Sequence, residues 1–554
     1  MLAALAELSR DDALCYCARL NAIVSGFDGT TDRVERQRKA LALLQVPEET
    51  AAIDQFIAHT GMKKSPVVFF RGQLLELARW ILENCNNHAD EPNTFYTRSV
   101  RSAFLRAALI ASELWGRRIF SNRLADEGDS AEQLRRALGA FRKGTEEGNE
   151  APHPGVAVGR GWILFSKHMP ASLHDFDSLF KAETGLTLLQ YYTCAFGVMK
   201  ETFASKTGTG IFHTRGFGAA TKMPESFDQF VRLKSQAPEE LAQALQSPGG
   251  TSGYKTLRER PIVNFSDNRS AVLDPTLYFD SLTTSPLFAV LRRAGKARQN
   301  EIFSAFGMAF EHYANDFLGR MYPAGSGLLA SRFSPNVKGR TALGQEFEVD
   351  GIVNYGTSAV MFEIKASWIV ESKILTDDHQ VFLEHVRELY GVSSVPSQRP
   401  KGVAQLAKVI NAMESHNWTG EDGEYRQVKE IYPVLLLHDE RMAAPGTGQF
   451  LDEEFQRSLG TMVRGIYVHP LIVMTVEDLE NLATSVEGFS LREFLKAYSL
   501  ENPDRMRSVH NFMATSPKFA DRIRPSKDVM DATFSLGEKI KAELFATTPA
   551  SSQT

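Results

Sequence analysis

The stretch GQEFEVDGIVNYGTSAVMFEIKAS, residues 344–367, predicts a β-hairpin that turns at 354–358. Successive side chains of a strand point to opposite faces, so Glu348 and Asp350 share one face of the first strand. The opposite face of that strand is expected to carry Phe347, Val349 and Val353. In the second strand, Met361, Glu363 and Lys365 share a face opposite Val360, Phe362 and Ile364. The polar side chains of both strands therefore gather on one side of the hairpin.

The register of this hairpin brings two carboxylates together. If the turn centres between Gly356 and Thr357, Asp350 lies directly opposite Glu363. Directly opposed carboxylates have Cβ atoms only about 5 Å apart and repel unless a cation lies between them. Oxygen ligands at that spacing favour Mg²⁺ or Mn²⁺ over Zn²⁺. Lys365 is on the same face, where its charge can orient an attacking water or stabilise charge developing on a phosphate, which favours phosphodiester hydrolysis.

These residues resemble the motif of the PD-(D/E)XK nuclease superfamily, in which an acidic residue ends one strand and Glu-x-Lys follows on the next. The resemblance covers about residues 295–480 and implies a restriction-endonuclease-like mixed sheet flanked by helices. Val349 stands where the family name has proline, which leaves the ligand geometry unaffected. The resemblance implies that Asp350, Glu363 and the carbonyl of Ile364 bind the metal and that Lys365 assists the nucleophilic water.

A helix expected at 300–318 precedes the hairpin. It has a predicted inward stripe of Ile302, Phe303, Phe306, Phe310, Tyr313 and Phe317. Glu311 lies beside this stripe, and related nucleases often place a glutamate on this helix to contact the metal or its water. Glu301 is the alternative for this role, and Glu311 is preferred because it lies in the middle of the helix.

A second helix, at 401–414, follows the hairpin. Val403, Leu406, Ile410 and Met413 are its predicted buried residues. Lys401, Gln405 and Lys408 line another face, which either holds a nucleic-acid backbone or is an ordinary solvated face. Lys373 and Arg399, from the insertion before this helix, are expected to extend this face as a positive rim. Such phosphate contacts position nucleic acid without recognising its sequence.

The wider order of elements predicts an α/β fold behind a helical half. Helix 298–318, strands 346–354 and 359–366, a polar insertion 368–400, helix 402–414 and strands 431–439 and 465–475 give α-β-β-α-β-β. Apolar periodicity predicts helices in 67–85 and 101–120. We expect four segments: a mainly helical domain 1–204, a loop-rich connection 205–290, the nuclease domain 291–515, and a C-terminal segment 516–554 with a helix near 527–546 and a disordered end.

Composition limits the possible functions. The net charge of −5 and pI near 6.3 give no global attraction to polyanions, so a nucleic-acid site must come from a local basic surface. The four cysteines form no CxxC pair, and no signal segment or apolar run long enough to span a membrane is present, which indicates a cytoplasmic protein without a membrane partner. The glycines of 206–218 lack the phosphate-loop pattern, so a plain loop is expected there. Trp368 and Tyr390 either stack on a base or belong to the core.

The function expected from these observations is that of a Mg²⁺- or Mn²⁺-dependent endonuclease, with DNA favoured over RNA by analogy alone. A bacterial restriction or anti-phage defence effector, with a separately encoded ATPase or sensor protein as partner, is one hypothesis for its role. The alternatives are a non-catalytic scaffold with the nuclease fold, which predicts a missing ligand or lysine, and a subunit for repair or transposon processing. Cutting both strands of a duplex needs two sites, so a homo-oligomer is also expected.

Overall fold

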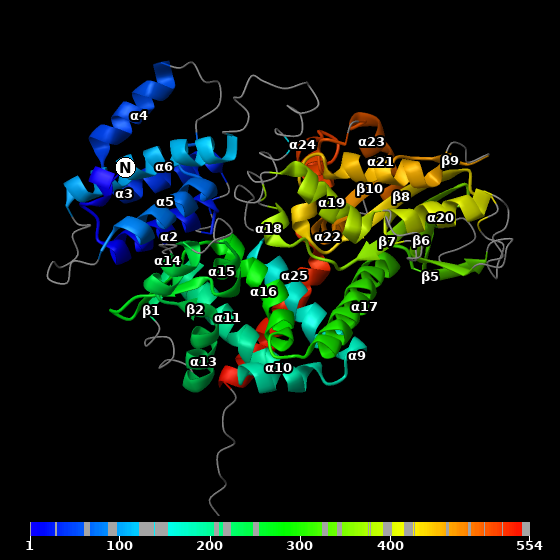
Figure 1. The fold of residues 1–554 in the computed structure, drawn as a ribbon, viewed down its shortest axis with the longest axis horizontal. Coiled ribbons are helices and arrows are strands. Elements are labelled where there is room, and N and C mark those ends of the chain that lie inside the picture. The colour runs from blue at the N-terminus through cyan, green and yellow to red at the C-terminus, as the bar shows by residue number, and fades with distance from the viewer. Residues whose placement is uncertain are drawn as a thin grey trace, which may run out of the picture.

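The predicted hairpin forms the centre of a mixed sheet in the computed structural model (Figure 1). The sheet has the strand order β10-β8-β7-β6-β5, with β9 beside β8. The strands are β5 (Arg332–Arg340), β6 (Glu346–Asn354), β7 (Ser358–Lys365), β8 (Glu430–Leu437), β9 (Tyr467–Val468) and β10 (Ile472–Thr475). The pairs β5–β6 and β6–β7 are antiparallel, whereas β8 is parallel to β7, β9 and β10. The α/β class and a mixed sheet are therefore confirmed.

The structure describes most of the chain. The described residues are 2–27, 30, 32–59, 67–86, 97–120, 138, 153–203, 210–213, 223–246, 254–323, 331–340, 346–374, 376, 378–391, 401–414, 425, 427–460, 465–485, 489–503, 505–522 and 524–545. Most of the glycine loop at 206–218 and of the end that we expected to be disordered lies outside them. Among the helices that are described, none is long and apolar enough to cross a membrane.

The register of the hairpin agrees with the prediction for four residue pairs. Gly351 faces Phe362 and Asn354 faces Ala359, which is the pairing expected for a turn centred between Gly356 and Thr357. The turn is closed locally, because the amide of Gly356 donates to the side-chain oxygen of Asn354 at 2.8 Å. Gly356 has φ +81°, a conformation that glycine adopts without steric cost. The paired ladder stops at Gly351, one residue before the predicted Asp350–Glu363 pair.

The prediction for the faces of β6 is wrong beyond Asp350. Val349 and Ile352 belong to the same buried cluster although they are three residues apart, and Val353 packs in the cluster on the other side. Strict alternation would separate Val349 from Ile352. The break falls at Asp350 and Gly351, opposite Asn336 of β5, which has φ +49°. The backbone therefore departs from regular pleating at the residue that carries the predicted chemistry.

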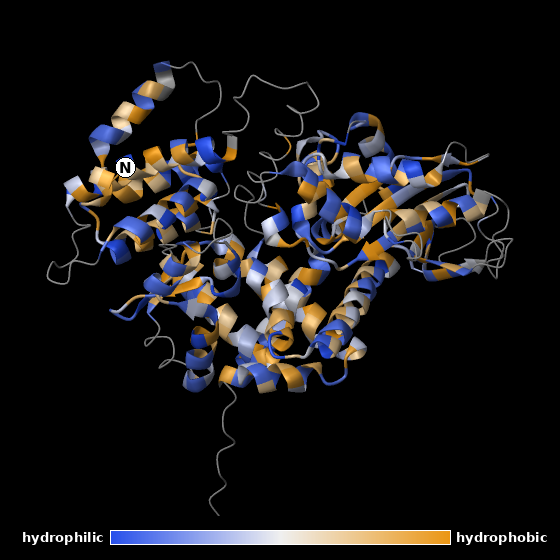
Figure 2. Cartoon of the chain, in the orientation of Figure 1, coloured by the Kyte–Doolittle hydropathy of each residue, from blue (hydrophilic) through white to orange (hydrophobic). Residues whose placement is uncertain are grey.

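Helices cover both faces of the sheet (Figure 1). Helix α17 (Lys296–Met321) packs on one face, and α20 (Val403–Glu414) packs on the other with α19 (His379–Tyr390) and α21 (Thr447–Leu459). Figure 2 shows orange hydrophobic strands between helices whose outer faces are blue. The predicted buried residues of α20 are confirmed, as are those of α17 except Phe303, which is 43 % exposed. The sequence prediction missed β5, α19 and α21.

The predicted helical half is also present. Its helices are α1 (Leu2–Leu5), α2 (Arg10–Val24), α3 (Arg33–Leu44), α4 (Pro47–His59), α5 (Arg71–Asn84), α6 (Arg98–Phe120), α8 (Pro154–Ile163), α9 (Met169–Ser172), α10 (Phe176–Thr184) and α11 (Leu188–Phe203). A π-helical turn, Leu164–His168, joins α8 to α9. The connecting region holds α13 (Pro224–Lys234), α14 (Pro238–Gln246), α15 (Tyr254–Glu259) and α16 (Pro275–Leu291). Between them lies a small sheet of β1 (Ile211–His213), β2 (Ser235–Gln236), β3 (Ile262–Asn264) and β4 (Arg269–Val272).

One hydrophobic cluster extends through all four predicted segments. Its members range from Ala22 to Ile540 and include residues of α8, α11, α16, α17 and the large sheet. The predicted boundaries at 204, 290 and 515 therefore separate segments that share one core. The remaining helices of the C-terminal half are α18 (Glu371–Ile374), α22 (Val476–Ser485), α23 (Leu491–Glu501), α24 (Val509–Thr515) and α25 (Lys527–Phe545). Short 3₁₀ turns are present at Glu440–Ala443 and Ala520–Arg522.

The C-terminal helix α25, predicted near 527–546, packs against α8. The hydroxyl of Thr533 donates to the carbonyl of Gly155 at 2.5 Å, across most of the length of the chain. A Cβ atom at Gly159 would lie 2.2 Å from the carbonyl oxygen of Val529, so the two helices are in contact through their backbones. This close approach requires a residue without a side chain on α8.

We predict that Gly159→Ala lowers the free energy of unfolding by roughly 1–3 kcal/mol, because the added methyl overpacks a backbone contact. Gly537→Ala, in α25, is the matched control because a Cβ atom there meets nothing within 4 Å. Its expected effect is a stabilisation of up to about 1 kcal/mol, since alanine favours a helix over glycine. Urea unfolding measures both, and a stabilised Gly159→Ala variant would contradict the packing described.

Candidate active site

Four residues that the sequence singled out lie close together at one end of the large sheet. Asp350 is on β6, Glu363 and Lys365 are on β7, and Glu311 comes from α17. Lys365 forms ion pairs with both strand carboxylates, and the charges of Asp350 and Lys365 act on Glu311. A residue from a separate helix thus joins the pair of strands, as the sequence predicted.

Where the backbone pairing of β6 and β7 ends, the side chain of Asp350 makes the next hydrogen bond between the two strands. Its Oδ2 atom accepts a hydrogen bond from the amide of Ile364 at 2.6 Å. The residue is only 9 % exposed, so this bond forms in a largely dry environment. The side chain therefore has a fixed position relative to β7, and it lies near Glu363 without being paired with it in the ladder.

The cation between the two carboxylates is the ammonium group of Lys365. Its Nζ atom lies 2.5 Å from Oε1 of Glu363 and 3.6 Å from Oδ2 of Asp350. Burial lowers the pKa of Lys365, but the charges of Glu363 and Asp350 outweigh burial and leave the pKa above its ordinary value. Lys365 is therefore positively charged at neutral pH.

Glu363 is the most unusual group in this cluster. Its side chain is fully buried, and apart from the Lys365 ammonium neither carboxylate oxygen has a hydrogen-bond partner. Burial raises the pKa of Glu363 to about 8, with the charge of Lys365 opposing that rise and the charge of Asp350 adding to it. Leaving a carboxylate so poorly satisfied costs stability, which is typical of functional sites.

Glu311 faces the same cluster from α17. Burial raises its pKa to about 7, the charge of Asp350 adds to the rise, and the charge of Lys365 opposes it. Glu301, the alternative residue, is 56 % exposed and pairs with Arg298 at 2.6 Å. The preference for Glu311 agrees with this placement.

The family resemblance implies a divalent cation, and the residues present fit one in part. Apart from the Lys365 ammonium, the oxygens of the buried Glu363 have no hydrogen-bond partner, and Ile364 lines the cavity beside this cluster. Within the described residues, no three His, Cys, Asp or Glu side chains are close enough together to hold a metal ion as they stand. Mg²⁺ usually binds one or two carboxylates and keeps several waters, so Asp350 and Glu363 suffice as side-chain donors.

Four of the five predicted nucleic-acid-binding residues lie in the described part of the chain. Gln405 of α20 donates to the carbonyl of Glu348 at 3.0 Å, which places it beside β6. Lys401 is exposed and lines the cavity described below. Lys408 lies one turn after Gln405 on α20, and Lys373 lies on α18. Arg399 lies outside the described residues.

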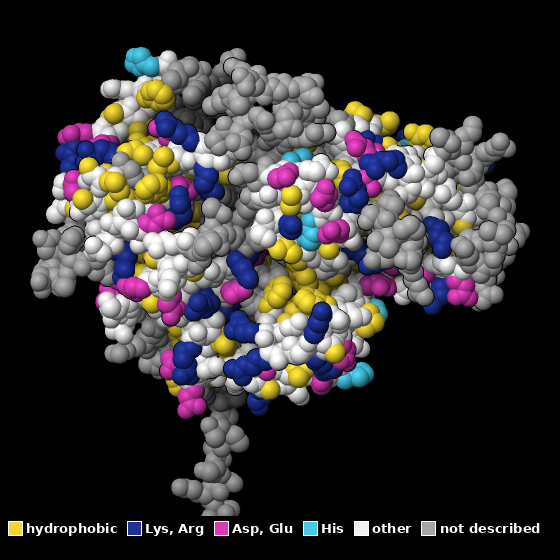
Figure 3. Space-filling view, in the orientation of Figure 1, with side chains coloured by type: hydrophobic (Ala, Val, Ile, Leu, Met, Phe, Trp, Pro, Cys, Tyr) yellow, Lys and Arg dark blue, Asp and Glu magenta, His cyan; other side chains and the backbone are white. Residues whose placement is uncertain are grey.

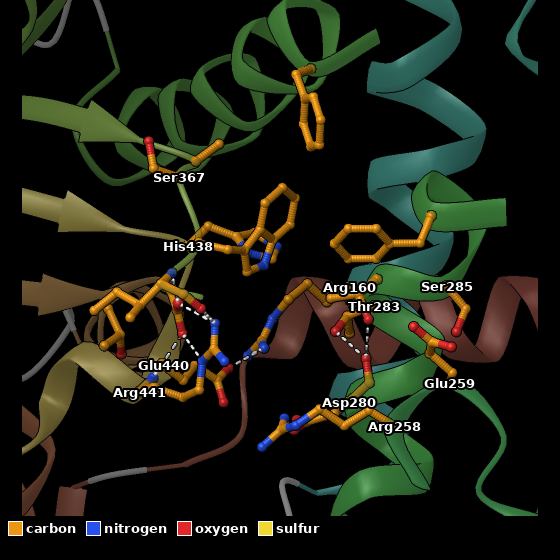
Figure 4. Close-up of a pocket in the computed structure, with 18 of the residues that line it drawn as sticks. Arg160, Arg258, Glu259, Asp280, Thr283, Ser285, Ser367, His438, Glu440 and Arg441 are labelled. Atoms are coloured by element: carbon orange, nitrogen blue, oxygen red, sulfur yellow. Dashed lines mark hydrogen bonds and ion pairs between the residues drawn. The ribbon is translucent and has the colours of Figure 1, made fainter. Parts of the chain in front are cut away.

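A cavity of about 1980 Å³ opens from this cluster toward the helical half. Lys365 and Glu311 are part of its wall. Figure 4 shows Ser367, His438, Glu440 and Arg441, which follow the strand ends, facing Thr283, Ser285 and Asp280 of α16. Sequence analysis did not find this opposite wall. Only tertiary packing brings α16 to the ends of β7 and β8, and no local sequence pattern indicates that these elements lie together.

Ion pairs and one neutral histidine hold the rim of the cavity in place. The guanidinium of Arg160 binds Glu440 (Figure 4). It also binds Glu480, and the guanidinium of Arg441 binds Asp439. His438 is buried against the rings of Phe306, Phe310 and Trp368. Burial lowers the pKa of His438 to about 3, so this ring is uncharged at neutral pH.

Comparison of the chain with models of protein families, with curated proteins and with solved structures finds no match.

We predict that, without added metal, Glu363→Gln becomes more stable relative to wild type as the pH rises from 5 to 8. In this range the buried carboxyl, with a pKa near 8, keeps a proton that the unfolded chain has lost, since the ordinary value is 4.5. Folding then takes up a proton, so wild-type stability falls with rising pH by at most about 1.4 kcal/mol per pH unit. Urea unfolding at several pH values measures the difference.

Glu348→Gln is the matched control for this experiment, because Glu348 lies on the same hairpin but is 47 % exposed. Its difference from wild type should change little between pH 5 and pH 8. A constant difference between Glu363→Gln and wild type would show that Glu363 is ionised over the whole range.

Proposed function

We propose that this chain is a metal-dependent nuclease of the PD-(D/E)XK type, which hydrolyses phosphodiester bonds in nucleic acid, with DNA as the favoured substrate. One observation carries the proposal: the buried Glu363, short of hydrogen bonds, lies beside Asp350 and shares with it the ammonium of Lys365. A mixed sheet with helices on both faces supports the restriction-endonuclease-like architecture that the motif implies.

Asp350, Glu363 and the carbonyl of Ile364 would hold the metal. A bound Mg²⁺ polarises a phosphoryl oxygen and lowers the pKa of a bound water. The protein supplies the rest: Asp350 is positioned by the amide of Ile364, and Glu363 is shielded from bulk water. Their fixed positions mean that little reorganisation is needed when the substrate arrives.

Lys365 and Glu311 have complementary roles in this proposal. The ammonium of Lys365 orients the attacking water and stabilises negative charge that develops on the phosphate. Glu311, with a pKa near 7, can take the proton that the water loses, because a general base works best when its pKa is near the working pH. The electrostatic environment of each side chain suits its role.

The charge of the cavity is compatible with a polyanionic substrate. Ten Lys and Arg side chains line it together with seven Asp and Glu side chains, although the whole chain carries a net charge of −5. This small excess of basic side chains next to the proposed catalytic cluster supports a polyanionic substrate. A phosphate backbone can approach Lys365 through this opening.

We predict that wild type cuts plasmid, linear duplex or single-stranded DNA in Mg²⁺ or Mn²⁺ but not in EDTA. Asp350→Ala and Lys365→Ala should each lower the cleavage rate at least about a hundredfold, because the first removes a ligand of the proposed metal and the second removes the positive charge that stabilises the reacting phosphate. Gel assays of product formation measure the rate, and circular dichroism confirms that the variants fold. Lys527→Ala, an exposed lysine of α25, should cut as wild type does. Unchanged cutting by Asp350→Ala or Lys365→Ala would refute this site.

We further predict that Glu311→Gln lowers the cleavage rate between about a hundredfold and ten-thousandfold at pH 7, whereas Glu301→Gln leaves it unchanged. Both glutamates are on α17, but only Glu311 reaches the cluster. Loss of a general base has an effect of this size. The rate of wild type should also fall as the pH drops below about 7, and this fall should be less steep in Glu311→Gln, in which only Glu363 still has to lose a proton. Equal rates for the two variants would assign Glu311 no part in the reaction.

A further inference from the structure

Aromatic side chains form a ledge in the cavity beside the proposed catalytic cluster. Phe288 of α16 and Phe303 of α17 both lie against Trp368, with ring centroids 5.5 and 6.5 Å from its own. Phe306 stacks behind Trp368 at 4.8 Å and is itself buried. Trp368 is partly exposed, so the ledge is packed against the buried Phe306 and still open to the cavity.

Exposed apolar surface is concentrated at this ledge. Ten large hydrophobic side chains are exposed among the described residues, and four of them, Phe288, Phe303, Met308 and Val370, line this one cavity. Figure 3 shows hydrophobic side chains in the hollow at the centre of the face, with basic side chains nearby. Apolar patches that remain exposed on a folded chain are typical of binding sites.

The charges around the ledge favour a ligand that carries phosphate. Several carboxylates of the cavity are paired with arginines, as in Glu440 with Arg160 and Asp280 with Arg258. Lys255, Arg292 and Lys401 also line the cavity, and none of the three forms an ion pair with another described residue. Aromatic rings next to unpaired cations are the combination that proteins use to bind single-stranded nucleic acid.

We propose that this cavity binds a single-stranded nucleic-acid segment, with an unstacked base on the ledge of Phe288, Phe303 and Trp368. The proposal rests on the nuclease function above and specifies its substrate as single-stranded. Trp368 follows Lys365 by three residues, so their Cα atoms are within about 11 Å. A base on the ledge is therefore close to the phosphate being cut. A base inside a duplex is stacked on both faces and cannot use such a ledge.

The test is binding of fluorescein-labelled oligonucleotides to the full chain in EDTA, where no cleavage is expected, measured by anisotropy. The probes are 20-nucleotide oligo-dT and oligo-U and the duplex of oligo-dT with oligo-dA. We expect wild type to bind a single strand at least tenfold more tightly than the duplex. Phe288→Ala and Phe303→Ala should each weaken single-strand binding about five- to a hundredfold, the range found when one stacking ring is removed.

Phe534→Ala is the matched control, because Phe534 is 65 % exposed on α25 and outside the cavity wall. The single-strand affinity of Phe534→Ala should equal that of wild type. Phe288 and Phe303 are exposed enough for their alanine variants to fold. Equal binding of duplex and single strand, or unchanged binding by both ledge variants, would overturn the proposal even if the chain cuts DNA. Ledge-dependent single-strand binding without cleavage in any metal would instead reject the nuclease function and leave the binding site in place.

Discussion

The arrangement depends on one buried contact, between the carboxyl group of Glu363 and the ammonium group of Lys365, at the end of a strand that is covered on both faces. Burying these polar groups with so few hydrogen bonds costs stability. The chain tolerates this only because α17 and α20 hold β7 from opposite sides. The same burial raises the pKa of Glu363 and removes competing water, so the instability of the site and its proposed chemistry have one cause.

The helical half contributes to the site through the shared core. Residues of α8, α11 and α16 belong to the same hydrophobic cluster as α17 and one face of the sheet. This packing sets the distance between α16 and the ends of β7 and β8, and the cavity lies between these elements. The ion pairs of Arg160 with Glu440 and Glu480 connect α8 of the helical half to the C-terminal half in the interior. The cavity is therefore a consequence of how the segments are joined in one core.

Local periodicity was sufficient to predict the hairpin, its register and the helix that carries Glu311. Period-two alternation identifies strands, and the turn residues set which pairs face each other. The same rule failed at Asp350, because its side chain bonds to the amide of Ile364 and the ladder ends there. Phe303 was predicted to be buried because it falls on the apolar stripe of α17, yet it borders a cavity that the sequence does not reveal. In both cases the missing information is the tertiary packing around the residue.

Net charge and local charge have opposite signs in this molecule, which bears on selectivity. At physiological ionic strength exposed charges are screened beyond about 8 Å, so the acidic surface elsewhere hardly affects a phosphate inside the cavity. An acidic exterior also gives little nonspecific attraction to duplex DNA. Binding then depends on how well a strand fits among the rings and cations of the cavity, and unstacking a base is cheapest in a strand that is already single. The charge balance of the molecule therefore agrees with the proposed preference for single strands over duplex DNA.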